Sequence, residues 1–222
     1  SHAQKLKRKC SRLLVSLGLT ELITWSFVDE KFQDFLGIEN EKIKISNPIT
    51  RDLSVLRSSL ATNLLLSIKK NFNRGFDNLG FFEIGPVFFG TEPNEQNDFI
   101  SAIRCGEEIS KDWLETSRST DIFDVKADLF KILELFNFSE NSIKISDEGI
   151  PHYFHPKKSG SINIGNITFA YFGEIHPTVI KNYDLPTNVS CFEFNLTQAL
   201  RFFKKKNISK PVFSPSPFQI SR

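Results

Sequence analysis

Residues 43–90, IKISNPITRDLSVLRSSLATNLLLSIKKNFNRGFDNLGFFEIGPVFFG, combine a short apolar strand, a proline-marked turn, one amphipathic helix and a long apolar strand. The helix is predicted from spacing, because Leu60, Leu64, Ile68 and Phe72 recur every four residues. This period places one apolar stripe along the helix, and that stripe must be buried. The rest of the chain is expected to pack on this unit.

Both ends of the predicted helix carry signals. Ser58 or Ser59 can accept a hydrogen bond from the first unpaired backbone amides, and Gly75 can take the left-handed position after the last turn. Leu79 to Phe89 then forms a β-rich run whose only charged residue is Glu83. We therefore predict a central strand covered on both faces, in which the carboxylate needs a partner.

Composition indicates a globular chain. The 222 residues are 40% hydrophobic and include 23 Phe, which is ample for a core of one large domain or two small ones. There is no apolar run near the ~20 residues that span a bilayer and no signal-peptide pattern, so we expect a cytoplasmic protein without a membrane segment. The three cysteines are scattered without metal-ligand spacing, and the net charge of +2 is too small to indicate nucleic-acid binding by itself.

The chain is expected to be an internal piece of a longer protein, since it contains no Met and begins Ser1-His2. Lys5 to Leu17 predicts an amphipathic helix with a basic face. That face is either solvated, a tether to an upstream domain, or a contact for RNA. Glu21 to Val28 alternates as one strand, and Asp29 can cap a short helix after it.

The remaining pattern mixes strands and helices. In chain order we expect a strand over 98–105, a polar loop or short helix over 107–120 anchored by Trp113, a strand ending near Val125 followed by a helix, a strand over 143–146, a loop over 151–159, a hairpin of 161–164 with 167–173, a helix over 177–183, a strand over 190–195, and a helix capped by Thr197 that runs to Phe203. This order predicts an α+β fold, with a mainly antiparallel sheet flanked by helices.

Common catalytic signatures are missing, including the phosphate loop GxxxxGK[ST], GxGxxG, GxSxG and CxxC. His152, His155 and His176 could suggest a metal site, but their spacing favours structural or hydrogen-bonding roles. Glu83 and Glu174 lie in apolar strands next to glycine. They form either a paired-carboxylate site or two separately held acids, each satisfied by a backbone amide or by a cation such as Arg57.

Seven phrases carry a family resemblance: ELITWSFV, NPITRDLSVLRSSLATNLL, NFNR, LGFFEIGPVFFG, DIFDVKADLFKILE, YFHPKKSGSI and FGEIHPTVIKNYDL. In order and spacing they resemble the C-terminal half of the bacterial phenylalanyl-tRNA synthetase beta subunit, over essentially the whole chain. The resemblance implies a class II synthetase-like fold. It also implies two regions, a catalytic-like module over 1–207 and, over 208–222, a linker with the truncated start of the anticodon-binding domain.

The resemblance also implies an emptied active site. Class II catalytic domains hold ATP phosphates with one arginine after the second-motif strand and another in the third motif, because the guanidinium fork fits phosphate oxygens. This sequence has Phe89 and Gly90 at the first position, and its counterpart of the third motif, FGEIHPTVIKNY, has no arginine. Losing two charged hydrogen bonds removes about 3–6 kcal/mol of phosphate binding. We therefore expect no catalytic, cofactor-binding or metal-binding residues in this chain.

By the same resemblance, the chain assembles with an alpha subunit in a heterotetramer of two alpha and two beta subunits. That complex uses ATP and magnesium to attach phenylalanine to tRNA(Phe). The residues where we expect contacts are Trp25, Phe27, Leu60, Leu64, Ile68 and Phe72 for the subunit interface, and Lys5, Lys7, Arg8, Lys204 and Lys205 for tRNA.

Two other functions stay open. One is an RNA-binding module that uses the basic segments 5–12 and 201–210 to contact tRNA directly. The other is an autonomous class II-like ligase with unusual phosphate ligands such as Lys157 or Lys158.

Overall fold

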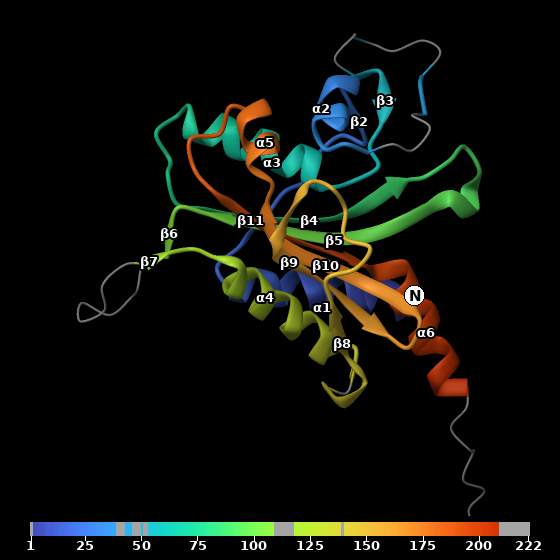
Figure 1. Cartoon of the computed structure of the whole chain (residues 1–222). Helices are drawn as coiled ribbons and strands as arrows, with labels where there is room; N and C mark the ends of the chain where they lie inside the picture. The colour runs from blue at the N-terminus through green and yellow to red at the C-terminus, as the bar shows by residue number, and fades with distance from the viewer. Residues whose placement is uncertain are drawn as a thin grey trace, which may run out of the picture.

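A seven-stranded sheet with helices on both faces forms the centre of the part of the chain that the structure describes (Figure 1). This computed structural model describes residues 2–38, 43–45, 50, 53–108, 118–138 and 140–208; for residues 2, 93, 108, 140 and 204–208 it describes the backbone alone. The helices are α1 (His2–Ser16), α2 (Glu30–Phe35), α3 (Ala61–Phe72), α4 (Ile122–Leu135), α5 (Pro177–Asn182) and α6 (Leu196–Ile208), with 3-10 turns η2 (Pro93–Glu95) and η3 (Glu140–Ser142). The strands are β1 (Thr20–Glu21), β2 (Phe27–Val28), β3 (Val55–Leu56), β4 (Leu79–Phe88), β5 (Gln96–Cys105), β6 (Glu107–Glu108), β7 (Arg118–Ser119), β8 (Lys144–Ser146), β9 (Phe154–Ile164), β10 (Ile167–Ile175) and β11 (Val189–Asn195).

The strand order of the main sheet is β1-β4-β5-β11-β10-β9-β8. Only the short β1–β4 pair is parallel, and the other pairs of this sheet are antiparallel. β2 with β3 and β6 with β7 form two further small sheets. The predicted α+β class with a mainly antiparallel sheet is confirmed.

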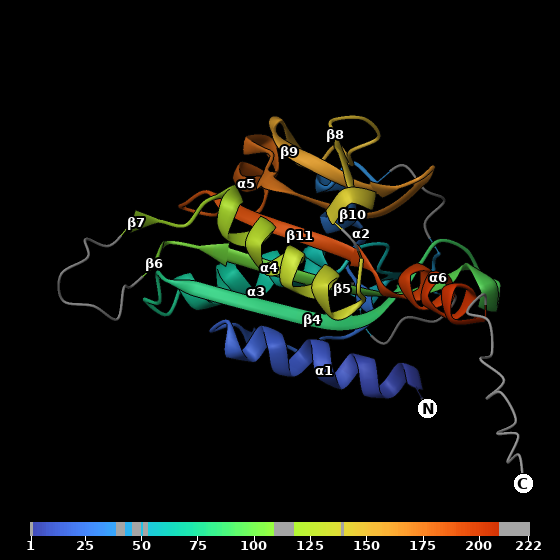
Figure 2. The ribbon, with the colours of Figure 1, turned by 90° about the horizontal axis from the view of Figure 1, so that it is seen from below.

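Each face of the sheet has its own apolar core. The face covered by α2, α3 and α5 contains Leu64, Ile68 and Cys191, whereas α1, α4 and α6 cover a second core around Phe82 and Phe192. Figure 2, in which the molecule is seen from below, shows α1 and α4 crossing the second face of the sheet. β4 and β5 are therefore covered on both sides, as the apolar run of residues 79–89 predicts.

The amphipathic helix predicted from the four-residue spacing of Leu60 to Phe72 is α3, and its ends behave as the sequence indicates. The Oγ of Ser59 accepts a hydrogen bond from the backbone amide of Ala61 at 3.0 Å. At the other end, Gly75 adopts a φ of 86°, a left-handed value that glycine tolerates without the Cβ clash of other residues.

Two predicted strands differ from the observed structure. Residues 21–28 are divided, because the chain pairs with β4 at β1 and then leaves the main sheet to pair with β3 at β2. The strand expected up to Val125 is the first turn of α4. Asp121 caps that turn, accepting from the amide of Phe123, while Asp124 accepts from the amide of Asp121. This reciprocal capping box favours a helix over the β propensity of Ile122 and Phe123.

Two further expectations are corrected. Part of the loop expected over 151–159 belongs to β9, which begins at Phe154. Phe154 pairs with Ile175 of β10, after a register shift that follows Gly173. Thr197 does not cap α6: its hydroxyl accepts from the amide of Asp98, and Asn195 accepts from the amide of Gln198 instead. Trp113, residues 46–49 and residues 209–222, which include nearly all of the expected linker, lie outside the described residues.

A buried ion pair connects three elements on the second face. The Nε of Arg104 on β5 donates to Asp128 on α4 at 2.7 Å, and its Nη2 donates to the carbonyl oxygen of Leu17, just after α1. One guanidinium thereby fixes both helices to the sheet.

Replacing Asp128 with alanine should lower the free energy of unfolding by about 3 kcal/mol, because the Arg104 charge would remain largely buried without its carboxylate. Urea denaturation followed by circular dichroism measures the loss. Glu134→Ala on the same helix breaks the exposed Lys131–Glu134 pair and should cost less than about 1 kcal/mol. Equal losses in the two variants would contradict this assignment.

Candidate functional site

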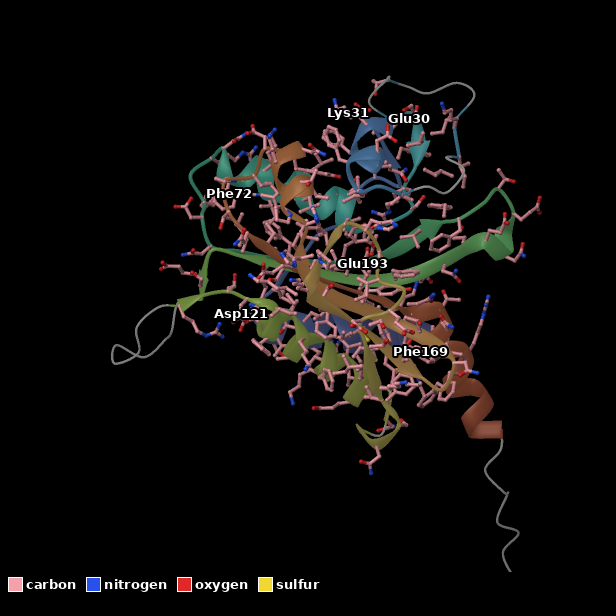
Figure 3. The ribbon with its side chains drawn as sticks, viewed as in Figure 1. Glu30, Lys31, Phe72, Asp121, Phe169 and Glu193 are labelled. Carbon is pink, nitrogen blue, oxygen red and sulfur yellow. The ribbon has the colours of Figure 1, made fainter. Side chains whose placement is uncertain are left out.

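Part of the expected subunit interface is internal. Leu60, Leu64 and Ile68 are fully buried in this chain, and Phe72 is half-buried at the edge of the same core. The apolar stripe packs on the sheet, as an amphipathic helix does when the sheet supplies an apolar face. The expectation that these three buried side chains contact a partner is therefore corrected. Figure 3 shows Phe72 in the helical layer on this face.

Trp25 has the opposite placement. Its side chain is 72% exposed, its neighbour Ile23 is 94% exposed, and Phe27 is half-buried. Large exposed apolar side chains that are close together indicate a contact surface more often than isolated ones do. Trp25 and Phe27 also line a groove of about 420 Å³ between the 24–29 segment and α3, together with Leu66. We call this the Trp25 groove.

Side-chain amides hold this exposed segment in place. The Nδ2 of Asn63 on α3 donates to the Oγ1 of Thr24 and to the backbone carbonyl of Trp25, both at 2.7 Å. The tryptophan backbone is therefore tied to the core although its ring is exposed. A backbone that is already fixed loses little conformational freedom when a partner covers its side chain.

Glu83 has the cationic partner that a buried carboxylate requires. The Nη1 of Arg57 donates to Glu83 Oε1 at 2.7 Å, and both side chains are almost completely buried. Thr24 donates to the other carboxylate oxygen at 2.7 Å, and the Nε of Arg57 donates to the carbonyl of Pro86. The prediction that Arg57 holds Glu83 is confirmed.

The paired-carboxylate alternative for Glu83 and Glu174 is wrong. Glu174 is in register with Ser190 and, through it, with Arg104, which contacts α4 on the second face. Glu83 contacts Arg57 on the α3 side, so the two acids lie on opposite faces. Glu174 accepts instead from the Nζ of Lys158, at 3.0 Å to each carboxylate oxygen.

The α3 face also contains a second cavity, of about 390 Å³, which we call the aromatic cavity. Its lining comprises Gly37, Ile38, Ser58, Phe89, Phe99, Pro151, His152, Tyr153, Thr168, Phe169, Tyr171, Glu193, Asn195 and Gln198. Glu193 and Tyr171 are directly opposite each other on β11 and β10, so they lie on the same face of the sheet. Figure 3 labels Glu193 near the centre of the molecule and Phe169 toward α6.

Glu193 is bound by hydrogen bonds alone within the described residues. Its Oε1 accepts from Ser59 Oγ at 2.7 Å and from the Ala61 amide at 3.4 Å, while its Oε2 accepts from the hydroxyl of Tyr153. Burial raises the pKa of Glu193, and these hydrogen bonds partly oppose the rise. Burial and the nearby Glu193 carboxylate raise the pKa of Tyr153 as well.

Sequence reasoning missed Glu193, although its signal was the same as that of Glu83. Each is a lone acid in an otherwise apolar strand, SCFEFN for Glu193 and GFFEIG for Glu83. The register places both opposite Ser101, hence on one face and two strand spacings or about 10 Å apart. Tyr153 was missed because its loop offers no periodicity.

The aromatic cavity does not fit ATP with magnesium. Among the described residues that line it there is no arginine or lysine, and the Glu193 carboxylate is the one buried charge among them. A triphosphate requires cationic donors, so this arrangement would repel it. Phe89, which replaces the expected arginine, is one of the lining residues and lies 6.1 Å from Phe99 between ring centroids.

The basic residues that we expect to contact tRNA lie on two helices, α1 and α6. On α1, Lys5 and Arg8 are exposed, whereas the Nζ of Lys7 forms an ion pair with Asp98 at 2.7 Å. Lys204 and Lys205 lie in α6, but their side chains are outside the described part of the structure. The structure therefore leaves Lys5 and Arg8 accessible and gives Lys7 a structural partner.

The histidines and cysteines show structural contacts. The Nδ1 atoms of His155 and His176 accept from backbone amides two residues further on. Burial raises the pKa of the Cys10 and Cys105 thiols to about 12. Within the described residues, no group of three or more His, Cys, Asp or Glu side chains could hold a metal ion. No described helix is long and apolar enough to cross a membrane.

Comparison with solved structures defines the fold class. The chain resembles the pyrrolysyl-tRNA synthetase PylSc from Desulfitobacterium hafniense, with a TM-score of 0.68 at 14% identity, covering 91% of this chain and 69% of the other. A second pyrrolysyl-tRNA synthetase structure from the same organism gives a TM-score of 0.67 at 13% identity, covering 95% of this chain and 74% of the other. The fold is that of a class II-like aminoacyl-tRNA synthetase catalytic domain.

Sequence comparison shows the family. Residues 1–196 match the model of the phenylalanyl tRNA synthetase beta chain CLM domain, and the chain belongs to this family. It is 34% identical over 189 residues to the phenylalanine–tRNA ligase beta subunit of Ehrlichia ruminantium (strain Welgevonden), covering 85% of this chain and 24% of that protein. The beta subunit of Bartonella quintana is 32% identical over 224 residues, covering 98% of this chain and 28% of that protein. The chain thus spans about a quarter of the length of these curated relatives.

Glu83→Gln should lower the free energy of unfolding by about 3 kcal/mol, because the buried Arg57 guanidinium would lose its counter-charge. Glu174→Gln is the matched control and should cost less than about 1 kcal/mol, since its partner Lys158 is half exposed. Urea denaturation of the two variants beside the unmodified chain gives the comparison. If Glu83→Gln were as stable as Glu174→Gln, the buried pair would not be a structural requirement.

Proposed function

We propose that this chain is a non-catalytic, assembly-forming region of a phenylalanine–tRNA ligase beta subunit. It supports ATP-dependent attachment of phenylalanine to tRNA(Phe) by an alpha subunit, in the cytoplasm. The observation that carries the proposal is the aromatic cavity: the sheet face of a synthetase-like fold has phenylalanines and a buried carboxylate where adenylation needs phosphate-binding arginines. The family membership supports the ligase assignment.

In this proposal ATP and magnesium act at the alpha subunit, because the residues of the aromatic cavity fit neither. The Trp25 groove is the proposed contact with that subunit, since its exposed Trp25, near the exposed Ile23 in sequence, has a backbone fixed to α3. Two alpha and two beta subunits complete the proposed assembly. Phe27 contributes at the floor of the groove, and Phe72 is at most a peripheral contact.

The 222-residue chain should form a stoichiometric complex with a matching alpha subunit, measured by size-exclusion chromatography with light scattering. Trp25→Ala should weaken the complex by ten-fold or more, because buried tryptophans contribute about 2 kcal/mol or more at interface centres. Phe123→Ala is the matched control. Phe123 is also exposed, at 68%, but it lies on α4 on the second face, so its variant should bind unchanged.

The same preparations separate assembly from catalysis. The chain alone should show no ATP–pyrophosphate exchange above a blank, and the complex should show exchange that depends on the alpha subunit. Exchange by the chain alone would overturn the non-catalytic assignment. If neither the unmodified chain nor the Trp25→Ala and Phe123→Ala variants bound the alpha subunit, these 222 residues would not be sufficient for assembly.

A second candidate function is direct contact with tRNA, favoured by the exposed basic face of α1. Lys5, Arg8, Lys9 and Arg12 are all exposed on one helix. Cations on one helical face can follow a phosphate backbone without distorting the fold.

If this face binds RNA, the logarithm of affinity for single-stranded RNA should fall with the logarithm of salt concentration at a slope of about −3 for four contacts. Filter binding or fluorescence anisotropy between 50 and 200 mM salt, roughly the range over which such slopes are measured, provides the test. Arg8→Ala should reduce the slope, whereas Lys131→Ala on α4 should leave it unchanged. A flat salt dependence would exclude the α1 face as an RNA contact.

A further inference from the structure

The aromatic cavity has a composition that suits a ligand of its own. We propose that it binds a small organic cation, namely a primary amine attached to an aromatic or branched apolar group. The ammonium would face Glu193, and the apolar part would lie among Phe89, Phe99 and Tyr171. This inference is independent of the proposed assembly role, because the cavity and the Trp25 groove share no lining residue.

The buried carboxylate supplies the first argument. An ionised carboxylate offers about four acceptor positions. The donors that reach Glu193 are the Ser59 and Tyr153 hydroxyls and the backbone amides of Ala61 and Leu60, and none of them carries a formal charge. The amino end of α3 offsets part of the negative charge through its dipole.

No described lysine or arginine forms an ion pair with Glu193, in contrast to Glu83 with Arg57 and Asp128 with Arg104. A buried charge is normally paired. A bound ammonium would supply a formal counter-charge, which none of the neutral donors provides. Burial, and next to it the Glu193 carboxylate, raise the pKa of Tyr171, which lines the cavity.

The aromatic walls supply the second argument. The faces of phenylalanine and tyrosine rings attract cations within about 6 Å of the ring centroid, and they bury apolar groups equally well. Phe89 and Phe99 form one end of the cavity and Tyr171 lies next to Glu193 in the register. These rings would stabilise both the ammonium group and the apolar group of an aromatic amine.

Size and access agree with a small ligand. A cavity of about 390 Å³ is at the lower end of the range of small-molecule sites, about 300–1,000 Å³. Gly37, His152 and Phe89 are exposed at its rim, so the cavity communicates with solvent, while Glu193 is buried at its floor. The arrangement selects by charge, because an anion of the same shape would meet the carboxylate.

The test uses three probes of one shape on the 222-residue chain: phenethylamine as the cation, 2-phenylethanol as the neutral analogue and 3-phenylpropionate as the anion. Ligand-observed NMR and isothermal titration calorimetry measure binding at neutral pH. We expect phenethylamine to bind at least ten-fold more tightly than the alcohol, and the carboxylate not to bind.

Variants assign the binding to this cavity. Glu193→Gln should remove the preference for the amine over the alcohol, and Phe89→Ala should weaken both ligands several-fold. Because Phe89 is 40% exposed, its variant should fold even if Glu193→Gln does not. Glu174→Gln, which removes a carboxylate from the opposite face, and Phe123→Ala, which removes an exposed ring there, should leave binding unchanged.

Equal binding of phenethylamine and 2-phenylethanol would overturn the proposal, as would an absence of phenethylamine binding to a chain whose circular dichroism shows it folded. Binding that persists unchanged in Phe89→Ala would place the ligand elsewhere and equally reject the site. Measuring alpha-subunit binding by the same variants keeps the assembly role separate, because none of the substituted residues lines the Trp25 groove.

Discussion

The buried ion pair between Arg57 and Glu83 is the contact on which one face of the sheet depends. Its guanidinium also donates to Thr24 and to the carbonyl of Pro86, so it joins the segment before β2, the residue after β3, and strand β4. Asn63 extends the network to α3 by donating to Thr24. Because desolvating two charges offsets much of their attraction, the pair contributes more to fixing this arrangement than to net stability. The geometry leaves no space beside it: a Cβ on Gly85 would lie 2.5 Å from Arg57 Nη2.

A second polar contact, around Glu193, positions the start of α3. Ser59 donates to the Glu193 carboxylate and accepts from the Ala61 amide, so a side chain of β11 takes part in capping a helix more than one hundred residues earlier in the chain. The two acids are on the same face and opposite the same serine, Ser101, but their partners differ. Glu83 is neutralised by a cation, whereas Glu193 is held by neutral donors. This difference makes one a structural pair and leaves the other able to attract a ligand.

Periodicity and capping residues were sufficient to predict α3, β4, the 161–173 hairpin and the α+β class, because these features are encoded locally. The predictions of secondary structure fail where tertiary contacts or local hydrogen bonds outweigh the preference of the local sequence. Residues 21–28 have uniform alternation, yet their pairing partner changes from β4 to β3. Asp121 and Asp124 start a helix inside a β-prone run. The partner of Glu83 could be named from the sequence, whereas the cavity around Glu193 could not, since strands β5, β10 and β11 meet there only after folding.

The charge distribution on the α3 face bears on the proposal that this synthetase-like fold does not bind nucleotides itself. The guanidinium of Arg57 points into the protein, where its donors bind Thr24, Glu83 and Pro86, so it has no fork to offer a phosphate. Arg104 serves the opposite face, bound to Asp128. Phe89, where the family resemblance leads us to expect an arginine, lines the aromatic cavity. Arg57 and Arg104 therefore serve the fold, and the cavity lining combines aromatic rings with the Glu193 carboxylate. This distribution of charge supports the proposal that the face does not bind nucleotides and that the exposed Trp25 takes part in assembly.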